Sequence, residues 1–516
     1  MTPHRAQAAA GRKAMVVSGH GDATKAAWQV LASGGSVADA AIAGAAVLAV
    51  TQPQACTLGG DAFALVHDAA RARSEGLNAS GPSPRLATRE RFGNAIPQRG
   101  AAAASVPGAV GGWGALHERH GKMPWNELLQ PAIDLARKGC AASSGLARST
   151  ETYADLIRSS EAMRSLFHAR NRPLAENERF TQPALARTLE AIAGEGAASF
   201  YQGTIAHGIA KACAEQGGLL RQEDFSGFVP EWVAPIEVSY RSYRVRAMPP
   251  NSYGLYLLLQ LLYLEEERLE RETMDSPRRI AALARAAQAA FALGKRAVAD
   301  PRFAPEPFEP LLGPEGRRRL RESSGEGAAN RGGTAVISVM DSSGNAVTLV
   351  QSIFLVFGSG CLDPETGILL NDRMIGFTTE PGHPNEVAPR KRPAHTLCPC
   401  QVFDAEGKIR YALGTPGGPG QTLTIAQVLQ AAIEERASLA DAISAPRWSQ
   451  DLASKAVVED AMPEATVEGV RSLGLALEKA QPGSPYFGSA EGIERSADGS
   501  LKGVADFRRD ASAYGE

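Results

Sequence analysis

The chain has 516 residues, of which 44% are hydrophobic and 21% are charged, a composition typical of soluble globular proteins. Its 54 lysine and arginine residues nearly balance 56 aspartate and glutamate residues, so the sequence lacks the basic excess expected of a protein that binds nucleic acid or anionic membranes. A small-molecule partner is therefore favoured, and the length allows either two or three domains or one large layered domain.

The N-terminal residues and the cysteines indicate a reducing compartment. Residues 1–28 carry scattered charges but no continuous apolar segment of the kind a secretory signal needs, so we expect a cytoplasmic protein. Six cysteines are too few for a disulfide scaffold. Cys398 and Cys400 lie close together in the sequence, but a zinc site needs further ligands at recognisable spacings, so we expect buried or strand-facing thiols and no metal.

The first third of the chain is rich in alanine and predicts two helices followed by two strands. Asp22 is a candidate cap for a helix that ends at the glycine pair 34–35. Ser36 and Asp39 form a capping-box pattern that predicts the start of a second helix. Residues 59–80 then predict two strands around a polar turn.

The middle of the chain predicts helices and the last third predicts strands. Helical patterns extend from residue 124 to about residue 300 and are interrupted by a β-rich segment, 234–250. Two hairpins follow, one with its Gly-Asn turn near residue 344 and one over residues 400–414. Several antiparallel strands with helices before and after them predict sheets covered by helices.

Familiar cofactor and hydrolase motifs do not fit the sequence. The segment “GSGCLD”, which begins at residue 358, lacks the last glycine of the dinucleotide fingerprint, and no glycine-rich loop ends in Gly-Lys-Ser or Gly-Lys-Thr. The nucleophile elbow of α/β-hydrolases is also absent at “VFGSG”, where Phe357 occupies a required glycine position. We therefore expect no cofactor and no serine of that hydrolase class.

Thr334 is the candidate nucleophile. It follows Gly332, Gly333 and a polar, glycine-rich segment (321–333) that is open to cutting, and it precedes a predicted buried strand. If cleavage made Thr334 N-terminal, its own α-amino group, with a pKa of about 7.7–8.0, would serve as the base that a weak hydroxyl nucleophile needs. The alternative is that Thr334 is only the first residue of a strand, where threonine is common.

Blocks spread over nearly the whole chain match a known family in number and in order. They include “GGSVADAAIAGAAVLAVTQPQACTLGGDAFALVHD”, “SVPGAVGGWGALHERHGKMPWNELLQPAIDLARKG”, “GLLRQEDFSGFV”, “YRSYRVRAMPPNSYG”, “FGSG”, “GILLND”, “KRPAHT” and “GTPGGPGQT”. On these blocks the chain resembles the γ-glutamyltransferase family of N-terminal-nucleophile hydrolases. The resemblance implies a four-layer αββα fold, made as one precursor that cuts itself between Gly333 and Thr334. The subunits, 1–333 and 334–516, would stay associated as a heterodimer or as a dimer of heterodimers.

The resemblance implies a set of catalytic residues around Thr334. The second hydroxyl that contacts the nucleophile in the family falls at Ser352, which keeps the hydroxyl of the family's threonine and loses a methyl group. The family's oxyanion loop falls at Pro416, Gly417 and Gly418. Two glycines in an ordinary tight turn are the alternative for this loop. Fixed donors aimed at a developing oxyanion each contribute roughly 3 to 4 kcal/mol in comparable sites.

The residues that recognise glutamate in the family are changed in this chain. The arginine that binds the substrate α-carboxylate falls at Ser80, and the aspartate that binds the α-amino group falls at Gly376. The family's asparagine two residues beyond the second hydroxyl falls at Phe354, and its paired serines fall at His395 and Thr396. A serine hydroxyl cannot replace the charge and bidentate geometry of arginine, so typical γ-glutamyl transfer is not expected.

The changed pocket resembles a divergent branch of the family, in which “PAHT”-like and “GGPGQ”-like blocks recur and to which oxamate amidohydrolase belongs. This implies hydrolysis of a small acid amide, with Arg373 as the candidate cation for a single carboxylate and His395 as either a substrate contact or a packed residue. The alternatives are a surface ion pair at Arg373, a γ-glutamyltransferase or glutathione hydrolase with an altered pocket, and an unprocessed relative that only binds. The sequence leaves open whether water or an amine accepts the acyl group.

Overall fold

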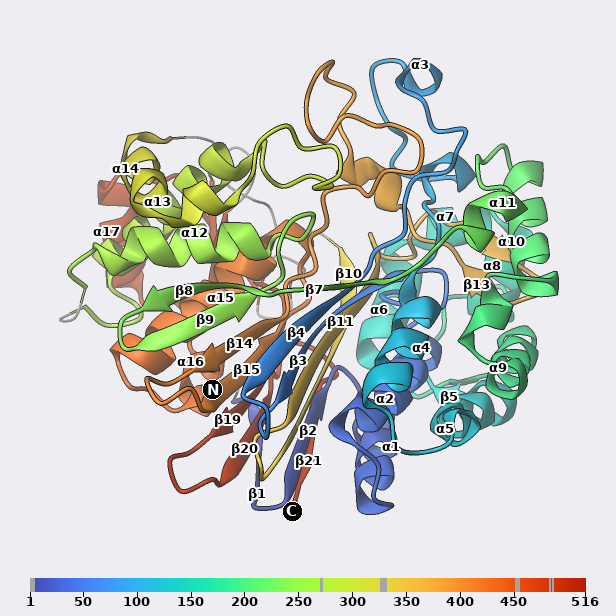
Figure 1. Cartoon of the computed structure of the whole chain (residues 1–516), viewed down its shortest axis with the longest axis horizontal. Helices are drawn as coiled ribbons and strands as arrows, with labels where there is room; N and C mark the ends of the chain where they lie inside the picture. The colour runs from blue at the N-terminus through green and yellow to red at the C-terminus, as the bar shows by residue number, and fades with distance from the viewer. Residues whose placement is uncertain (1–4, 270–271, 325–331, 451–454, 482–483, 485–486) are drawn as a thin grey trace.

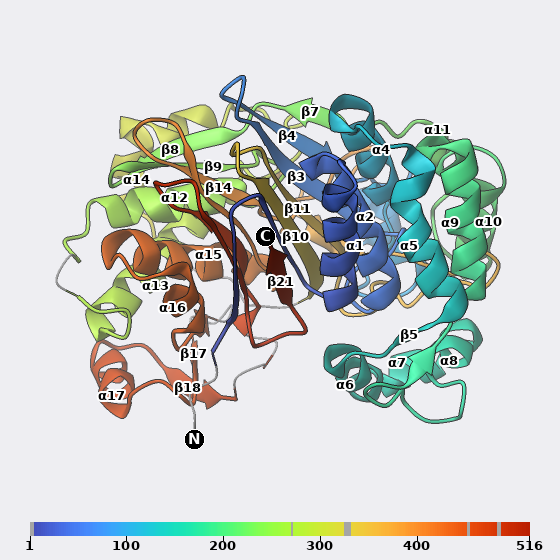
Figure 2. The ribbon, with the colours of Figure 1, turned by 90° about the horizontal axis from the view of Figure 1, so that it is seen from below.

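Two sheets packed face to face form the centre of the molecule (Figure 1). The structure is a computed structural model that describes residues 5–269, 272–324, 332–450, 455–481, 484 and 487–516. Within these residues each large sheet has seven strands, all pairings are antiparallel, and helices cover the outer face of each sheet (Figure 2). The predicted four-layer αββα arrangement is confirmed.

The first sheet contains the strand that begins at the candidate nucleophile site and the neighbouring strand that ends beside it. Its order is β21-β2-β10-β11-β3-β4-β7. The strand bounds are Ser512–Gly515, Ala14–Ser18, Gly333–Asp341, Ala346–Phe354, Asp61–Asp68, Arg73–Ala79 and Glu231–Val233. Its outer layer is built by α1 (Gly21–Ala32), α2 (Val37–Thr51), α4 (Ala109–His120), α5 (Trp125–Lys138) and α9 (Pro183–Glu195).

The second sheet has the order β1-β20-β19-β15-β14-β9-β8. Its strands are Gln7–Gly11, Leu501–Ala505, Glu491–Arg495, Ile409–Gly414, Cys400–Phe403, Tyr243–Ala247 and Ile236–Tyr240. The helices α12 (Gly254–Glu265), α13 (Pro277–Gly294) and α15 (Gln421–Leu429) pack over it. Cys398 and Cys400 are buried free thiols in this layer.

Smaller elements complete the described part of the chain. The helices are α3 (Arg89–Phe92), α6 (Ser144–Thr152), α7 (Ala154–Arg158), α8 (Glu161–Phe167), α10 (Thr204–Glu215), α11 (Gln222–Ser226), α14 (Pro314–Glu322), α16 (Leu439–Ser444) and α17 (Glu464–Ser472). The short strands are β5 (Cys140–Ala141), β6 (Arg179–Phe180), β12 (Leu362–Asp363), β13 (Ile368–Leu369), β16 (Trp448–Gln450), β17 (Ala456–Glu459) and β18 (Leu477–Ala480). Of the described helices, none is both long and apolar enough to cross a bilayer.

Side chains alternate between two cores along β10, as the period of a strand requires. Ala335, Ile337 and Val339 pack against the helices of the outer layer. Val336 and Met340 point the other way and pack between the two sheets. The strand is buried on both faces, which explains why its sequence reads as an almost continuous apolar run.

The two helix starts predicted near the N-terminus have different outcomes. The capping box is confirmed, because Ser36 Oγ accepts a hydrogen bond from the N–H of Asp39 at 3.0 Å and an Asp39 carboxylate oxygen accepts one from Ser36 N–H at 2.8 Å. The cap predicted at Asp22 is wrong. His20 caps α1 through its ring Nδ1, which accepts from the N–H of Asp22, and Asp22 lies inside the first turn. A carboxylate at that position still interacts favourably with the positive end of the helix dipole.

Each of the two large sheets contains strands from before and from after residue 333. In the first sheet, β10 lies between β2 and β11, and β11 pairs with β3. In the second sheet, β14 pairs with β9, and β20 pairs with β1. The segments 1–333 and 334–516 therefore share one pair of sheets. Most of the predicted cutting segment, 325–331, lies outside the described residues, and its openness stays a prediction.

Candidate functional site

Thr334 is the second residue of β10 and lies where β10 begins beside the end of β11. Gly333 is paired with Phe354, and the register shifts between Gly333 and Ala335, so a local irregularity surrounds Thr334. The Thr334 side chain is buried, and its Oγ1 donates a hydrogen bond to Ser352 Oγ at 3.3 Å. The structure thus brings the predicted nucleophile and the predicted second hydroxyl together.

Ser352 connects Thr334 to the peptide bond that precedes it. The Ser352 hydroxyl donates to the carbonyl oxygen of Gly333 at 2.6 Å. Its oxygen also accepts a hydrogen bond from the backbone N–H of Phe354 at 2.7 Å, which fixes the rotamer of the serine. One side chain therefore contacts both the hydroxyl of Thr334 and the carbonyl of the 333–334 bond. This arrangement can polarise that carbonyl while it holds the neighbouring hydroxyl in place.

Arg373 places a buried guanidinium group beside the two hydroxyls. It begins a short turn, Arg373–Gly376, and its side chain is 1% exposed, so the alternative of a surface ion pair is wrong. Its Nη2 lies 3.4 Å from Ser352 Oγ, and its Nη1 lies 3.3 Å from Thr396 Oγ1. The Phe354 ring covers the guanidinium at 4.3 Å. Phe354 has a φ of +77°, an unusual conformation for an aromatic residue.

Asp61 and His395 lie next to Arg373. Asp61 Oδ2 is 3.7 Å from Arg373 Nε and 3.1 Å from His395 Nε2, and all three side chains are buried. Burial raises the pKa of the Asp61 carboxyl to about 7, although the nearby Arg373 charge opposes the rise. Burial lowers the pKa of Arg373 to about 10. Burial, and to a smaller extent the charge of Arg373, hold the pKa of His395 well below its usual value, so the imidazole is neutral.

A second buried carboxyl belongs to Asp372, which directly precedes Arg373 in the chain. It accepts a hydrogen bond from the N–H of Leu355 at 3.1 Å, and Arg99 Nη1 is 3.9 Å away. Burial raises the pKa of Asp372 to about 7, against the opposing charge of Arg99. Arg373 therefore has two acidic neighbours, Asp61 and Asp372, and burial raises the pKa of each to about 7.

The Pro416–Gly418 loop follows β15 and adopts a backbone that requires glycine. Gly417 has a φ of +133° and Gly418 a φ of +57°, conformations that a β-branched residue would strain. A Cβ added to Gly332 would lie 3.9 Å from Gly418 Cα and 2.6 Å from the carbonyl oxygen of Phe354. The loop is therefore close to the chain that leads into Thr334, as an oxyanion loop must be.

Two positions predicted at the substrate pocket, Ser80 and Gly376, have close contacts within the protein. Ser80 Oγ donates to Asn78 at 2.7 Å and accepts from Asn251 Nδ2 at 3.1 Å, so its hydroxyl is used within a buried polar group. Gly376 lies close to the backbone of the neighbouring segment, since an added Cβ would be 2.5 Å from the carbonyl oxygen of Ala394. A side chain at that position, such as the family's aspartate, would need the backbone to move. Their predicted roles at the changed glutamate pocket stay predictions.

The sequence reasoning missed Asp61. The signal available was positional: Asp61 begins β3, and Ser352 is its paired residue on β11. Phe63 and Leu65, two and four residues further along β3, pack between the two sheets, so Asp61 points toward the same interior as Ser352. An ionisable residue at the start of a largely apolar strand was the available signal, but the partners of Asp61 could not be predicted because they come from distant segments.

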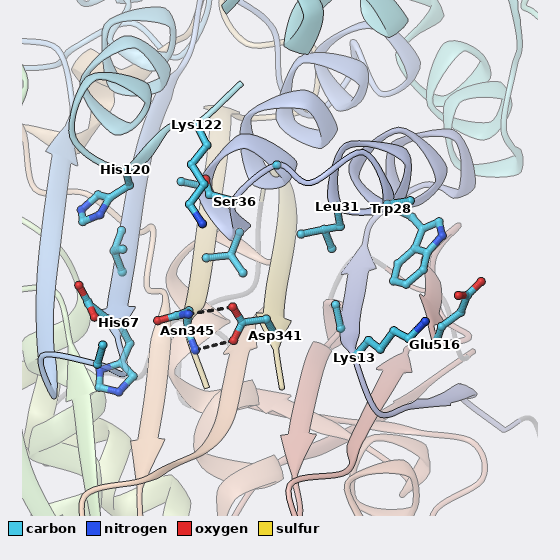
Figure 3. A pocket seen from close by; sticks show the side chains of 18 residues that line it. Lys13, Trp28, Leu31, Ser36, His67, His120, Lys122, Asp341, Asn345 and Glu516 are labelled. Carbon is cyan, nitrogen blue, oxygen red and sulfur yellow. Dashed lines mark hydrogen bonds between the residues drawn. The ribbon is translucent and has the colours of Figure 1, made fainter. Parts of the chain in front are cut away.

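A separate pocket lies at the opposite end of β10 (Figure 3). It has a volume of about 650 Å³ and is lined in part by Lys13, Trp28, Lys122 and Asp341. Asp341 ends the strand that has Thr334 near its start, which places Asp341 about 23 Å along the strand from Thr334 at roughly 3.3 Å per strand residue. Asp341 accepts two hydrogen bonds from Asn345 within it (Figure 3). The residues around Thr334 do not line this pocket.

The family model for gamma-glutamyltranspeptidase matches residues 23–516. The chain belongs to this family. A glutathione hydrolase-like YwrD proenzyme of Bacillus subtilis is 34% identical over 98% of this chain and 99% of its own length. An oxamate amidohydrolase proenzyme of Klebsiella pneumoniae is 31% identical over 97% of this chain and 98% of its own length. The solved structure of a cephalosporin acylase from Bacillus halodurans superposes with a TM-score of 0.92 at 30% identity, covering 100% of this chain and 98% of that one.

Membership of the gamma-glutamyltranspeptidase family makes the chain an enzyme of the acyl-transferring, N-terminal-nucleophile class. The resemblance inferred from the sequence blocks is confirmed, and the alternative of a relative that only binds is not supported by these enzyme relatives. The three relatives are named for glutathione, oxamate and cephalosporin, so the family alone does not assign the acyl group. That choice depends on the side chains around Thr334.

We predict that Ser352→Ala slows both cleavage of the 333–334 bond and substrate turnover by roughly 10- to 100-fold. The change removes every hydrogen bond of the Ser352 hydroxyl, including those that it accepts from Phe354 N–H and Arg373. The two neutral ones that join it to Thr334 and Gly333 together contribute about 1–3 kcal/mol, and about 1.4 kcal/mol corresponds to tenfold in rate. Ser352→Thr keeps the hydroxyl and is the matched control, expected within a few-fold of the wild type. Intact mass spectrometry over time and initial-rate kinetics measure the two effects. Wild-type rates in the alanine variant would contradict a role for this hydroxyl.

Proposed function

We propose that the protein is a self-processing N-terminal-threonine amidohydrolase that hydrolyses a small acid amide through an acyl-enzyme. The observation that carries the proposal is the continuous contact from Thr334 Oγ1 to Ser352 Oγ and on to the Gly333 carbonyl oxygen. An ordinary strand residue does not need a fixed hydroxyl partner that also binds the preceding carbonyl. The relatives named as proenzymes support processing at this bond.

Self-cleavage uses the Thr334 hydroxyl as an intramolecular nucleophile. Its oxygen attacks the carbonyl carbon of Gly333, the C–N bond breaks, and the nitrogen takes a proton and becomes the free amino group of Thr334. Water then hydrolyses the resulting ester, leaves a carboxylate on Gly333 and returns the hydroxyl. The subunits 1–333 and 334–516 remain associated as a heterodimer because strands of both segments are hydrogen-bonded to one another within each sheet.

Turnover repeats this chemistry on a substrate amide. The freed α-amino group, with a pKa of about 7.7–8.0 in peptides, accepts the hydroxyl proton as Thr334 attacks the substrate carbonyl. The backbone N–H groups of Gly417 and Gly418 stabilise the oxyanion. Ammonia leaves with the proton, and water hydrolyses the acyl-threonine ester to a carboxylate product. Ser352 orients the hydroxyl through both steps.

The acyl group is proposed from the charges that surround Thr334. A γ-glutamyl group brings an α-carboxylate and an α-ammonium, and Ser80 and Gly376 offer no charge to pair with either. A short acid amide has one carboxylate next to its reacting carbonyl. Arg373 Nη2, 3.4 Å from Ser352 Oγ, is the guanidinium placed for that carboxylate. The 31% identical oxamate amidohydrolase supports this choice.

A glutathione hydrolase with an altered pocket is the second candidate. The observation that favours it is the 34% identity to a glutathione hydrolase-like proenzyme along nearly the whole length of both chains. In that case a cation other than the family's arginine would bind the glutamate end. The buried position of Arg373 against Thr396 and Ser352 favours a shorter substrate, because a guanidinium so close to the nucleophile cannot reach the far end of a glutamyl chain.

We predict that purified protein consists of two chains, the second beginning at Thr334, and that Thr334→Ala remains one chain. The same hydroxyl is required for cleavage and for turnover, so the variant should also be inactive. Thr348→Ala is the matched control, since Thr348 is a buried threonine on β11 away from the junction. Intact mass spectrometry gives the result. A new N-terminus at residue 334 in the Thr334→Ala protein would exclude self-processing by this residue.

We also predict that the two-chain enzyme turns over oxamate with a kcat/KM more than tenfold above that for glutathione. Arg373→Gln should raise the KM for oxamate by at least tenfold, because a charge-assisted pair contributes about 1.5–3 kcal/mol. The neutral diamide oxamide should be affected much less. Arg390→Ala, which changes an exposed arginine of the neighbouring segment, is the control and should match the wild type.

Comparable kcat/KM values for glutathione and oxamate would mean that other residues bind the glutamate end. An unchanged oxamate KM in Arg373→Gln would remove Arg373 from the substrate site even if the substrate class is right.

A further inference from the structure

The charge of Arg373 is shared with Asp61 before any substrate arrives. Arg373 is the cation that the proposed function assigns to the substrate carboxylate, and the inference below rests on that function. Its Nε is 3.7 Å from Asp61 Oδ2, and this Nε has no hydrogen-bond partner among the described residues. The ion pair is therefore a close electrostatic contact that lacks a hydrogen bond. A second anion that approaches Arg373 must compete with Asp61 for the same positive charge.

Asp61 itself is fixed from two other sides. Its Oδ1 accepts a hydrogen bond from the N–H of Gly81 at 2.9 Å, and its Oδ2 contacts His395 Nε2 at 3.1 Å. The N–H of Leu397 donates to His395 Nδ1 at 3.3 Å, so the ring proton lies on Nε2 and points at Asp61. The Phe63 ring packs on the imidazole, with ring centres 4.7 Å apart. The carboxyl cannot swing away to release Arg373.

A bound carboxylate would therefore leave an excess negative charge inside the protein. With Asp61 ionised, Asp61 and Arg373 are neutral as a pair, and a substrate carboxylate brings the buried group to a net charge of −1. The free-energy cost of an uncompensated charge in a buried site exceeds what a hydrogen bond returns. If Asp61 Oδ2 takes a proton from the solvent, Arg373 and the substrate form a single neutral pair.

We propose that Asp61 is a positioning residue that holds Arg373 beside Ser352 together with His395, and that Asp61 takes up one proton when a carboxylate binds Arg373. No bond other than the O–H of Asp61 is formed or broken in this step. The proton returns to solvent when the carboxylate product leaves. The site thus binds a carboxylate only when Asp61 is protonated.

The groups around Asp61 differ in whether they can change charge near neutral pH. Arg373 and Arg392 carry positive charge, and Tyr201, on a neighbouring helical turn, is neutral because burial raises its pKa. Tyr253, beside Arg373, has its pKa raised to about 12 by burial, and His395 stays neutral. The groups that remain are Asp61, Asp372, which directly precedes Arg373, and the α-amino group that processing would create at Thr334.

The sign of the pH effect follows from proton uptake. Below the pKa of Asp61, about 7, the acid is already protonated and binding is independent of pH. Above it, each pH unit should weaken carboxylate binding tenfold. The α-amino group of Thr334 weakens binding further above about pH 8, when it loses its charge. A variant that removes only the Asp61 step, compared with the wild type at each pH, separates the two effects.

The test measures the inhibition constant of oxalate on the two-chain enzyme from pH 5.5 to pH 8.5. Asp61→Asn keeps the size of the side chain and one of its two acceptor oxygens but cannot ionise. We expect the wild-type to variant ratio of inhibition constants to be flat below pH 7 and to rise about tenfold per unit above it. Asp372→Asn is the matched control and should keep the wild-type profile. Dividing by the variant cancels the contribution of the α-amino group.

A second measurement uses the wild type alone, in case Asp61→Asn fails to fold or to process. Calorimetric titration of oxalate at pH 7.2, in two buffers with different ionisation enthalpies, gives the protons taken up per oxalate bound. Asp61 should contribute about half a proton, because at that pH it is partly ionised while the α-amino group is mostly protonated. The same uptake is expected for Asp372→Asn.

The outcomes distinguish this inference from the proposed function. Suppose that Arg373→Gln loses oxalate binding, while the ratio of inhibition constants between wild type and Asp61→Asn is flat with pH and the wild type takes up no proton. This result would overturn the role of Asp61 and leave the acid-amide function in place. A pH dependence that disappears in Asp372→Asn and persists in Asp61→Asn would assign the proton to Asp372 and would also overturn the role of Asp61. Failure of oxalate to inhibit at any pH would overturn both.

Discussion

The hydrogen bond from Ser352 Oγ to the Gly333 carbonyl oxygen is the contact on which the rest of the site depends. It forms because β10 and β11 are adjacent strands of one hairpin, so the serine near the end of one strand meets the backbone at the start of the other. The two sheets and their helices make this geometry rigid, since both strands are buried on both faces. A hydroxyl fixed in this way can act first on the peptide carbonyl and then on a substrate carbonyl that takes its place.

Buried charge is the second constraint on the chemistry. The family's recognition of glutamate requires a positive and a negative group at the far end of the pocket, and this chain has neither at Ser80 and Gly376. It instead buries Arg373 next to the hydroxyls and offsets its charge with Asp61. In the proposed function, a guanidinium in this position selects for a carboxylate close to the reacting carbonyl, and we infer that its acidic neighbour makes that selection depend on pH. On this proposal, the same few side chains set the length of the substrate and the pH dependence of its binding.

The sequence predicts the layers, the hairpins and the Thr334–Ser352 pair, because local patterns and family blocks carry them. It predicts the position of Arg373 near the site but not its burial, which depends on Phe354 covering it from another strand. Asp61 could not be found in the same way, since its partners His395 and Arg373 lie more than 300 residues away and meet it only where the two sheets face each other. The cap of α1 was misplaced because a histidine ring nitrogen replaced the usual carboxylate or hydroxyl.

The most direct test of the central claim is to trap the acyl-enzyme. Two-chain protein is mixed with oxamate, quenched in acid during turnover and digested, and the peptides are mapped by mass spectrometry. The account predicts the added mass of an oxalyl group on the peptide that begins at Thr334, and its absence when substrate is omitted. An acyl group carried by Ser352 or any other residue, with Thr334 unmodified during active turnover, would contradict the assignment of Thr334 as the nucleophile.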